Sequence, residues 1–299
     1  MHALPFRGAA YEGTLERHFS GWASLATMHG KERAIAPILA HELGVRVCVA
    51  PGLDTDALGT FTGEIQRVGS ARESALAKAC LALRYAPDAD YGIGSEGSFG
   101  PDVQMPFATV GHEVIALVSR SDDLVLFGSD ISTQTNCAEA IVADLDDALA
   151  CARRFGFPEH GAVVMGVRDG RAAPTHGLVK GIVSADALRD AVERTIASCG
   201  TACLQSDMRA HVNPTRMLAI ARATADLVRS ARSRCPNCRQ PGYAIIERER
   251  GLPCRDCNEP SDLTSSLVYG CTRCQQRDVR ARPDGRTTAD AAECDRCNP

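Results

Sequence analysis

Short apolar segments alternate with amphipathic ones along the first three quarters of the chain. Residues 22–27 are apolar and short, which is typical of a buried strand, and the pattern after them predicts a helix that ends at Gly44. Ser70-Ala-Arg-Glu73 has the sequence of a capping box and predicts a second helix. Because strands and helices alternate in this way, we expect an α/β domain over residues 1–231, with a mixed sheet flanked by helices.

The same periodicities predict the remaining elements of this domain. Further strands are expected over residues 45–50, 90–94, 113–119, 124–128, 162–167, 178–183 and 201–205, and further helices over residues 136–155, 184–198 and 214–233. Residues 94–100, Gly-Ser-Glu-Gly-Ser-Phe-Gly, are expected to form a glycine-rich turn after a strand.

The pattern changes completely after residue 231, where cysteine pairs replace the apolar periodicity. Four Cys-x-x-Cys pairs follow one another, separated by 15, 13 and 19 residues: Cys235/Cys238, Cys254/Cys257, Cys271/Cys274 and Cys294/Cys297. Two such pairs supply the four thiolates of a tetrahedral zinc site, so residues 232–299 predict a small zinc-ribbon domain with two structural zinc ions. We expect sequential pairing, with the first two pairs on one ion and the last two on the other; a cross-braced arrangement is the alternative.

The charge of this tail bears on its partners. From residue 231 onward there are 12 Arg and 10 Asp or Glu, and each four-thiolate zinc site adds two negative charges, so the tail carries no basic footprint. The whole chain has a formal net charge of −4. We therefore expect the tail to be structural or to dock a protein partner, and not to bind nucleic acid.

Cysteine usage and hydropathy also suggest a compartment. The other six cysteines are scattered, mostly in apolar context, which favours buried thiols over a disulfide framework. No apolar run approaches the roughly 18 residues that span a bilayer. We expect a cytoplasmic protein with no membrane association.

Lysine is rare, which draws attention to each one that is present. Of 33 Lys and Arg residues, only Lys31, Lys78 and Lys180 are lysines. Lys31 follows a predicted strand and a glycine turn, at the start of a helix whose dipole and N–H groups favour an anion. His29-Gly-Lys31 is therefore a candidate phosphate-binding segment.

Polar clusters at the ends of the predicted strands supply the other candidates, because ligands of open α/β sheets bind at those ends. The candidate phosphate-binding residues are His29, Lys31, Lys180, Arg209, Arg216, Asp54 and Asp56. The candidate Mg²⁺ ligands are Glu73 and Glu96, and the candidate catalytic residues are Glu96, His211 and Asp207. Each has a simpler interpretation: the two loop aspartates can hold a turn, Glu73 can serve only as a helix cap, and the arginines can pair with local acids.

Some of these residues resemble a known family. Leu25-Ala-Thr-Met-His-Gly-Lys31 resembles the phosphate-binding segment of inosine/xanthosine triphosphate pyrophosphatases, and Glu73-Ser-Ala-Leu-Ala-Lys78 is similar to a helical segment of that family. Residues 90–99 and His211 resemble its following strand and its last helix. The resemblance implies Lys31 on the triphosphate, Glu73 as a Mg²⁺ ligand, Glu96 as metal ligand or base, and His211 near the base or phosphates. The chain departs from the family in His29, in Ser95-Glu96 and in its zinc tail.

Taken whole, the chain also resembles a bacterial family of unknown function. The matching segments are the Lys-Glu helix start, the Asp-Thr-Asp loop, residues 95–101, residues 207–217 and the cysteine pairs that follow them. This second resemblance implies no activity.

Two functional hypotheses follow. The first is a Mg²⁺-dependent hydrolase of a nucleotide or related phosphate ester, in which Glu96 or His211 activates water. The second is a non-enzymatic protein that binds a small anionic ligand and docks a partner through its zinc tail. The hydrolase requires acids and bases to converge on one metal-binding pocket, whereas the binding protein does not.

Overall fold

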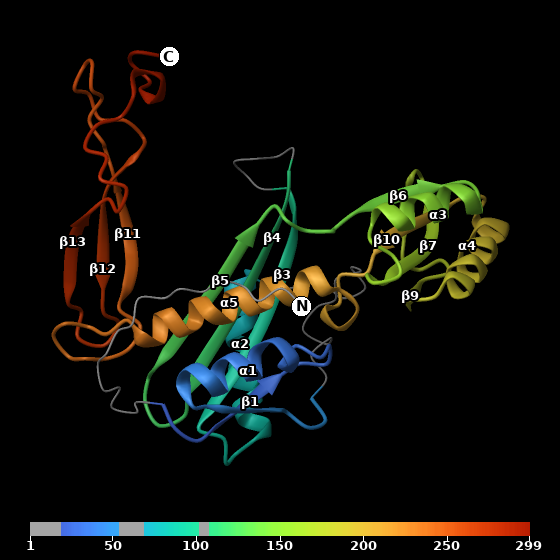
Figure 1. The fold of residues 1–299 in the computed structure, drawn as a ribbon, viewed down its shortest axis with the longest axis horizontal. Helices are drawn as coiled ribbons and strands as arrows, with labels where there is room; N and C mark the ends of the chain where they lie inside the picture. Colours follow the sequence, from blue (N-terminus) through green and yellow to red (C-terminus); the bar gives the residue numbers. More distant parts are fainter. Residues whose placement is uncertain (1–18, 54–68, 102–107) are drawn as a thin grey trace.

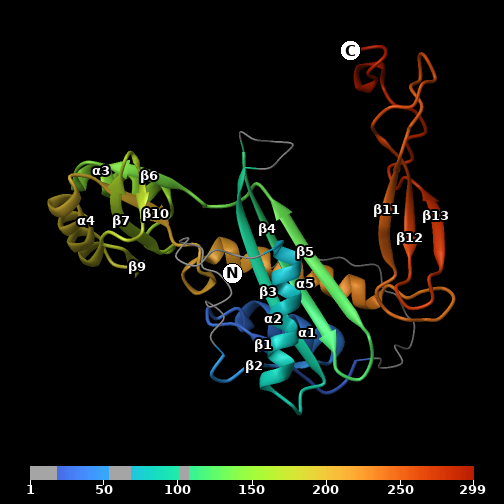
Figure 2. The same cartoon turned by 180° about the vertical axis from the view of Figure 1, so that it is seen from behind.

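The computed structural model describes residues 19–53, 69–101 and 108–299, which form three separate β-sheets (Figure 1). We call the first two sheet A and sheet B, and the part from residue 233 onward, which holds the third sheet, the C-terminal arm. Sheet A lies between sheet B and the arm in two opposite views (Figures 1 and 2).

Sheet A is a mixed sheet of five strands in the order β2-β1-β3-β4-β5. Its strands are β1 (Trp22–Ala26), β2 (Arg46–Val49), β3 (Tyr91–Pro101), β4 (Thr109–Ser119) and β5 (Val125–Ser132). Strand β1 is parallel to both its neighbours, whereas β3, β4 and β5 are antiparallel. The last residue of β1, Ala26, pairs with Gly94, so β3 continues well beyond the end of β1.

Three helices cover the two faces of sheet A. Helices α1 (Glu32–Leu43) and α5 (Pro214–Arg232) pack on one face, and α2 (Ala71–Tyr85) packs on the other (Figures 1 and 2). The main apolar core lies between the sheet and the α1–α5 layer. A smaller core of alanine and valine lies under α2.

The helix boundaries predicted for this part are confirmed. Gly44 ends α1 in the left-handed conformation, with φ of 69°. Ser70 and Glu73 form the capping box of α2, and Asn213 caps α5 ahead of Pro214.

The glycine-rich turn predicted over residues 94–100 is wrong, because these residues continue strand β3. A Cβ atom at Gly92 or Gly94 would lie 2.1 or 2.0 Å from a carbonyl oxygen of α2. The glycines therefore allow the helix to approach the strand closely, and their spacing of two places both on the same face.

The helix predicted over residues 136–155 is also wrong in its first half. Strand β6 (Glu139–Val142) comes first, and α3 (Leu145–Arg154) begins only after Asp144, whose side chain accepts a hydrogen bond from the Asp147 N–H. Residues 139–142, between Asn136 and Asp144, form strand β6, so the helix can begin only at Asp144, which caps it as well as Asn136 could.

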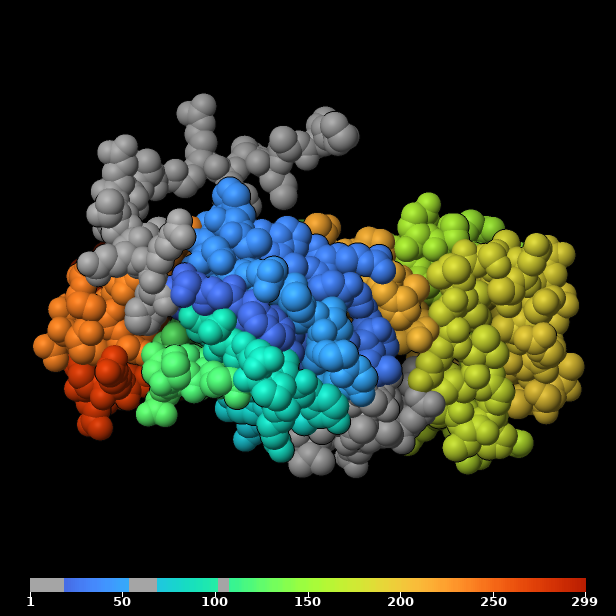
Figure 3. All heavy atoms as spheres, turned by 90° about the horizontal axis from the view of Figure 1, so that it is seen from below, coloured from blue at the N-terminus to red at the C-terminus, as the bar shows by residue number. Residues whose placement is uncertain are grey.

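Sheet B is separate from sheet A and has its own core, so the single sheet expected over residues 1–231 is two sheets. Its strand order is β6-β10-β7-β8, with β9 also paired to β7. The elements after β6 and α3 are β7 (Ala162–Arg168), β8 (Arg171–Ala173), β9 (Val179–Ile182), α4 (Ala185–Cys199) and β10 (Ala202–Ser206). In the space-filling view, sheet B and its helices lie at the opposite end of the molecule from the C-terminal arm (Figure 3).

The arm contains a three-stranded antiparallel sheet in the order β11-β12-β13. These strands are β11 (Ala244–Arg250), β12 (Thr264–Gly270) and β13 (Arg277–Ala281). Within the described residues, no helix has both the length and the apolar character needed to cross a membrane.

Candidate functional site

The eight cysteines of the arm form two clusters of four. One cluster contains Cys235, Cys238, Cys271 and Cys274, and the other contains Cys254, Cys257, Cys294 and Cys297. In each cluster the sulfur atoms all lie within 4.8 Å of one another. Zn–S bonds of about 2.3 Å place the sulfurs of a tetrahedral site about 3.8 Å apart. The observed Sγ–Sγ distances of 3.6 to 3.9 Å fit this geometry, so both clusters are suited to structural zinc.

The sequential pairing expected from the sequence is wrong, because the pairs alternate between the two clusters. The first and third pairs form one cluster, and the second and fourth form the other. The reason is the antiparallel register of the sheet: Ala244 at the start of β11 lies opposite Gly270 at the end of β12. The pair before β11 therefore meets the pair after β12, and the remaining pairs meet at the opposite end.

The second candidate site lies at the carboxyl end of β1. From β1 the chain passes through α1 to β2 on one side, and then through α2 to β3 on the other side of β1. Ligands of open α/β sheets bind where such connections diverge. The β1–α1 turn here contains His29 and Gly30, whose φ of +68° suits glycine.

Lys31 extends from this turn into the protein. It is 6% exposed, and its Nζ donates hydrogen bonds to the carbonyl oxygen and the hydroxyl of Ser95, at 3.0 and 3.2 Å. Both acceptors are uncharged. Lys31 is thus a deeply buried lysine, and no carboxylate of the described residues is hydrogen-bonded to its Nζ. It lies where the sequence predicted a phosphate-binding residue.

Two buried ion pairs flank Lys31. On the α2 side of sheet A, Lys78 Nζ lies 2.7 Å from Glu96 Oε2. On the α5 side, Arg216 Nε lies 2.6 Å from Glu113 Oε1, and both side chains are almost completely buried. We call Lys31, Lys78, Glu96, Glu113 and Arg216 the charged cluster.

The environment of Lys31 changes its protonation. Burial, together with the positive charges of Arg216 and Lys78, lowers the pKa of Lys31 from 10.5 to about 7, while Glu113 and Glu96 act in the opposite direction. Lys31, which an ordinary lysine pKa would keep fully charged, is therefore only partly protonated near neutral pH.

Two histidines stack beside this turn, and one of them, His211, lines an open surface pocket between the starts of α1 and α5, which we call the crevice. The rings of His29 and His211 lie 5.3 Å apart with an interplanar angle of 20°. Burial and the nearby Arg209 and Arg33 lower the pKa of His211, although Asp207 opposes them. His211 is thus uncharged at neutral pH and can accept a proton.

Asp207 and Arg209 hold the segment that crosses from sheet B to α5. Burial acts to raise the pKa of Asp207, but hydrogen bonds from Arg209 and the Gly181 N–H outweigh it and lower this pKa. Arg209 forms a bidentate pair with Asp207. Lys180 lies beside Gly181 in β9, so it belongs to sheet B and is only half-buried.

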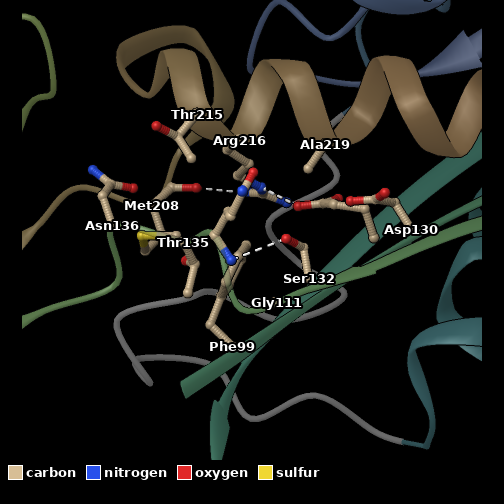
Figure 4. Close-up of a pocket in the computed structure, with 12 residues that line it drawn as sticks. Phe99, Gly111, Asp130, Ser132, Thr135, Asn136, Met208, Thr215, Arg216 and Ala219 are labelled. Atoms are coloured by element: carbon tan, nitrogen blue, oxygen red, sulfur yellow. Dashed lines mark hydrogen bonds and ion pairs between the residues drawn. The ribbon is translucent and has the colours of Figure 1, made fainter. Parts of the chain in front are cut away.

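Arg216 connects this crossing segment to sheet A, as the close-up shows (Figure 4). Its Nη1 donates to the carbonyl oxygen of Met208, while its Nε contacts Glu113 on β4. The adjacent cavity, lined also by Phe99 and Thr215, has a volume of about 10 Å³. This is room for about one water molecule, so a larger ligand would have to bind in the open crevice.

The predicted magnesium ligands do not converge in the structure. Glu73 is exposed and accepts hydrogen bonds from the backbone N–H and the hydroxyl of Ser70. Glu96 pairs with Lys78 on the buried side of α2. Among the described residues, the two cysteine clusters are the only groups of three or more His, Cys, Asp and Glu side chains placed to share a metal ion. Asp54 and Asp56 lie outside the described residues.

The sequence analysis missed Glu113 as a member of this site. It precedes the apolar run of residues 114–118, so it was placed at the edge of a predicted strand. The apolar run that follows it is the signal that could have identified Glu113. Side chains alternate between the two faces of a strand, so Glu113 shares its face with Ile115 and Leu117, which are buried in the main core. A carboxylate on that face requires a buried cation.

Comparisons with known proteins add one result. No curated protein and no solved structure matches the chain, so no relative of known activity supports the resemblance to the pyrophosphatases. The model of one family, described as a domain of unknown function (DUF6671), matches residues 79–299. That match begins within helix α2 and covers β3, β4 and β5 of sheet A, sheet B and the C-terminal arm, and the chain belongs to this DUF6671 family.

Proposed function

We propose that the protein binds a phosphorylated small molecule, a nucleotide or related phosphate ester, at the carboxyl end of β1 and hydrolyses it. The observation that carries this proposal is the convergence of three basic side chains at that end of sheet A. Lys31 directly precedes α1, Arg216 lies in the first turn of α5 and Lys78 lies in the middle of α2, and the charges of Lys78 and Arg216 both act on Lys31. Cations beside a helix N-terminus favour a phosphoryl group.

His211 is the residue best suited to activate water in this reaction. It is exposed at the crevice, and its lowered pKa keeps it uncharged, as a general base requires. Glu96 and Asp207, the other candidates, are engaged by Lys78 and Arg209. We therefore assign Glu96 to holding Lys78 and Asp207 to holding Arg209.

Magnesium dependence is a separate part of the proposal. Apart from the cysteine clusters, the described residues hold no group of three or more His, Cys, Asp or Glu side chains placed to share a metal ion. Asp54 and Asp56, which lie outside the described residues, are therefore candidate Mg²⁺ ligands together with the phosphates of the substrate. If hydrolysis requires Mg²⁺, these two aspartates are the first to replace.

The direct test is the release of phosphate or pyrophosphate from a panel of nucleoside triphosphates by zinc-loaded protein, with and without Mg²⁺. We expect release from at least one member, and a fall in kcat of about 10²-fold or more in His211→Gln. His176→Gln is the matched control, because His176 bonds to Thr175 in sheet B, away from the crevice. Equal rates in both variants would reject His211 as the base.

The second candidate is a non-enzymatic binding protein, and one observation favours it. Both buried carboxylates of the charged cluster pair with cations, so neither is placed to act as a base. In that case the crevice binds a small anion and the arm docks a protein partner. Binding of pyrophosphate by calorimetry, without release from any member of the panel, would support this alternative.

A further inference from the structure

The charged cluster is electrically balanced without Lys31. Lys78 pairs with Glu96, and Arg216 pairs with Glu113, so these four side chains sum to zero charge. Lys31 instead donates its hydrogen bonds to the neutral oxygens of Ser95. A protonated Lys31 would therefore add one uncompensated positive charge to a buried site, which is costly.

We propose that, above neutral pH, Lys31 is uncharged in the ligand-free protein and takes up a proton when a phosphoryl anion binds at the crevice. The inference rests on the proposed function, since it concerns the same site and ligand. The proton comes from solvent and forms the third N–H bond of the ammonium, and no bond of the ligand is broken in this step. The anion then supplies the negative charge that the cluster lacks for Lys31.

The groups that face Lys31 from each neighbouring element support this assignment. Glu96 on β3 and Glu113 on β4 favour the ammonium, whereas Lys78 on α2 and Arg216 on α5 disfavour it. The carboxylates are already paired, so burial and the two cations prevail and lower the pKa of Lys31 to about 7. An anion would reverse this balance.

The scarcity of lysine makes the proposal measurable. With only three lysines in the chain, ¹³C-labelled lysine gives three Cε signals, which Lys31→Arg and Lys180→Arg assign by loss of one signal each. The titration is recorded with and without sulfate, a tetrahedral anion whose own charge is constant above pH 4. We expect the Lys31 signal to titrate near neutral pH and to move upward by at least one pH unit with sulfate.

Calorimetry in two buffers of different ionisation enthalpy counts the protons. Near pH 8 an upward shift of one unit from about pH 7 corresponds to uptake of about 0.4 proton, so we expect at least this uptake in the wild type and in Lys180→Arg. Lys31→Arg should take up none, because arginine remains protonated. In the wild type, sulfate affinity should fall by up to tenfold per pH unit between the titration of Lys31 in the free protein and its titration in the sulfate-bound protein, and level off above that range, by the linkage of one proton to binding.

Two other outcomes are possible, and each would contradict a different proposal. If sulfate binds but Lys31 titrates above pH 10, or its titration does not move, the proton-coupled step is wrong while the proposed function stands. If the wild type binds neither sulfate nor pyrophosphate, the proposed function is wrong and this inference with it. The titrations are recorded on wild-type protein, and the variants serve only to assign the signals. If Lys31→Arg does not fold, Lys180→Arg and Lys78→Arg assign the other two signals, and the remaining signal is that of Lys31.

Discussion

The C-terminal arm and sheet A both hold charged groups away from solvent, but they depend on them differently. The arm buries few large apolar side chains, among them Leu252, Leu267 and Val268, and its cysteine clusters hold the two ends of a thin sheet. Sheet A has a continuous apolar core of strands and helices, and its charged cluster lies at one end. We infer that metal binding by the cysteine clusters stabilises the fold of the arm. In sheet A the apolar core supplies the folding free energy, and it offsets the cost of burying the charged cluster.

The largest expected effect is therefore the loss of zinc from the arm. Structural zinc supplies about 10–16 kcal/mol of apparent folding free energy in small zinc domains. Chelation should unfold the arm and leave sheets A and B intact, as measured by amide hydrogen exchange. Exchange that stayed slow in β12 after complete zinc removal would contradict the dependence of the arm on metal.

Paired cysteine variants test the alternating arrangement itself. Cys238→Ser with Cys274→Ser removes ligands from one cluster only, so one zinc should remain bound. Cys238→Ser with Cys257→Ser damages both clusters, so no zinc should remain. Sequential pairing predicts the reverse result, and native mass spectrometry distinguishes the two. Cys48→Ser, at an exposed cysteine of β2, is the control that should keep both ions.

The next effect concerns the ion pair of Arg216 in sheet A. Arg216→Met leaves Glu113 buried without its cation, which should cost about 3–5 kcal/mol of unfolding free energy in a denaturant titration. Arg222→Met, six residues further along the same helix, is the control: the Arg222 side chain is 44% exposed in its pair with Asp130, so about 0–1 kcal/mol is expected.

A double variant separates the ion pair from packing at the same position. Glu113→Gln combined with Arg216→Met removes both charges and should recover part of the loss. If the double variant is less stable than Arg216→Met alone, the buried charge is not the cause.

These regions also differ in how far the sequence predicts them. Cysteine spacing alone identifies the zinc ligands, because a Cys-x-x-Cys pair binds a metal through local geometry. It does not identify which pairs meet, because this depends on the register of β11 against β12, set by contacts far apart in the chain. Lys31 could be singled out by type and position, but its pairing environment could not, because Glu113 and Arg216 are 103 residues apart.

The glycines of β3 show a different limit of prediction. Glycine within a strand and glycine in a turn look alike in sequence, and only the approach of α2 distinguishes them. Gly94→Ala should cost about 1–3 kcal/mol, because its Cβ would lie 2.0 Å from the Ala75 carbonyl oxygen, a backbone atom. Gly100→Ala, in the same strand with nothing within 4 Å of the added atom, should change stability by less than about 0.5 kcal/mol. Equal costs in thermal unfolding would contradict the close packing of α2 on β3.

The last expected effect is the dependence of the unfolding free energy on pH that Lys31 causes in sheet A. Its pKa is about 7 in the folded protein and 10.5 in the unfolded chain, so between these values the unfolded chain holds a proton that the folded protein lacks. Stability should therefore rise with pH by about 1.4 kcal/mol per unit between about pH 8 and 9.5, and Lys31→Met should remove this rise. Subtracting the two unfolding curves cancels the titration of the cysteines and tyrosines that both proteins share. Parallel curves would mean that Lys31 is charged in the fold, and the charged cluster would then resemble the arm in holding an uncompensated charge that a bound ion must balance.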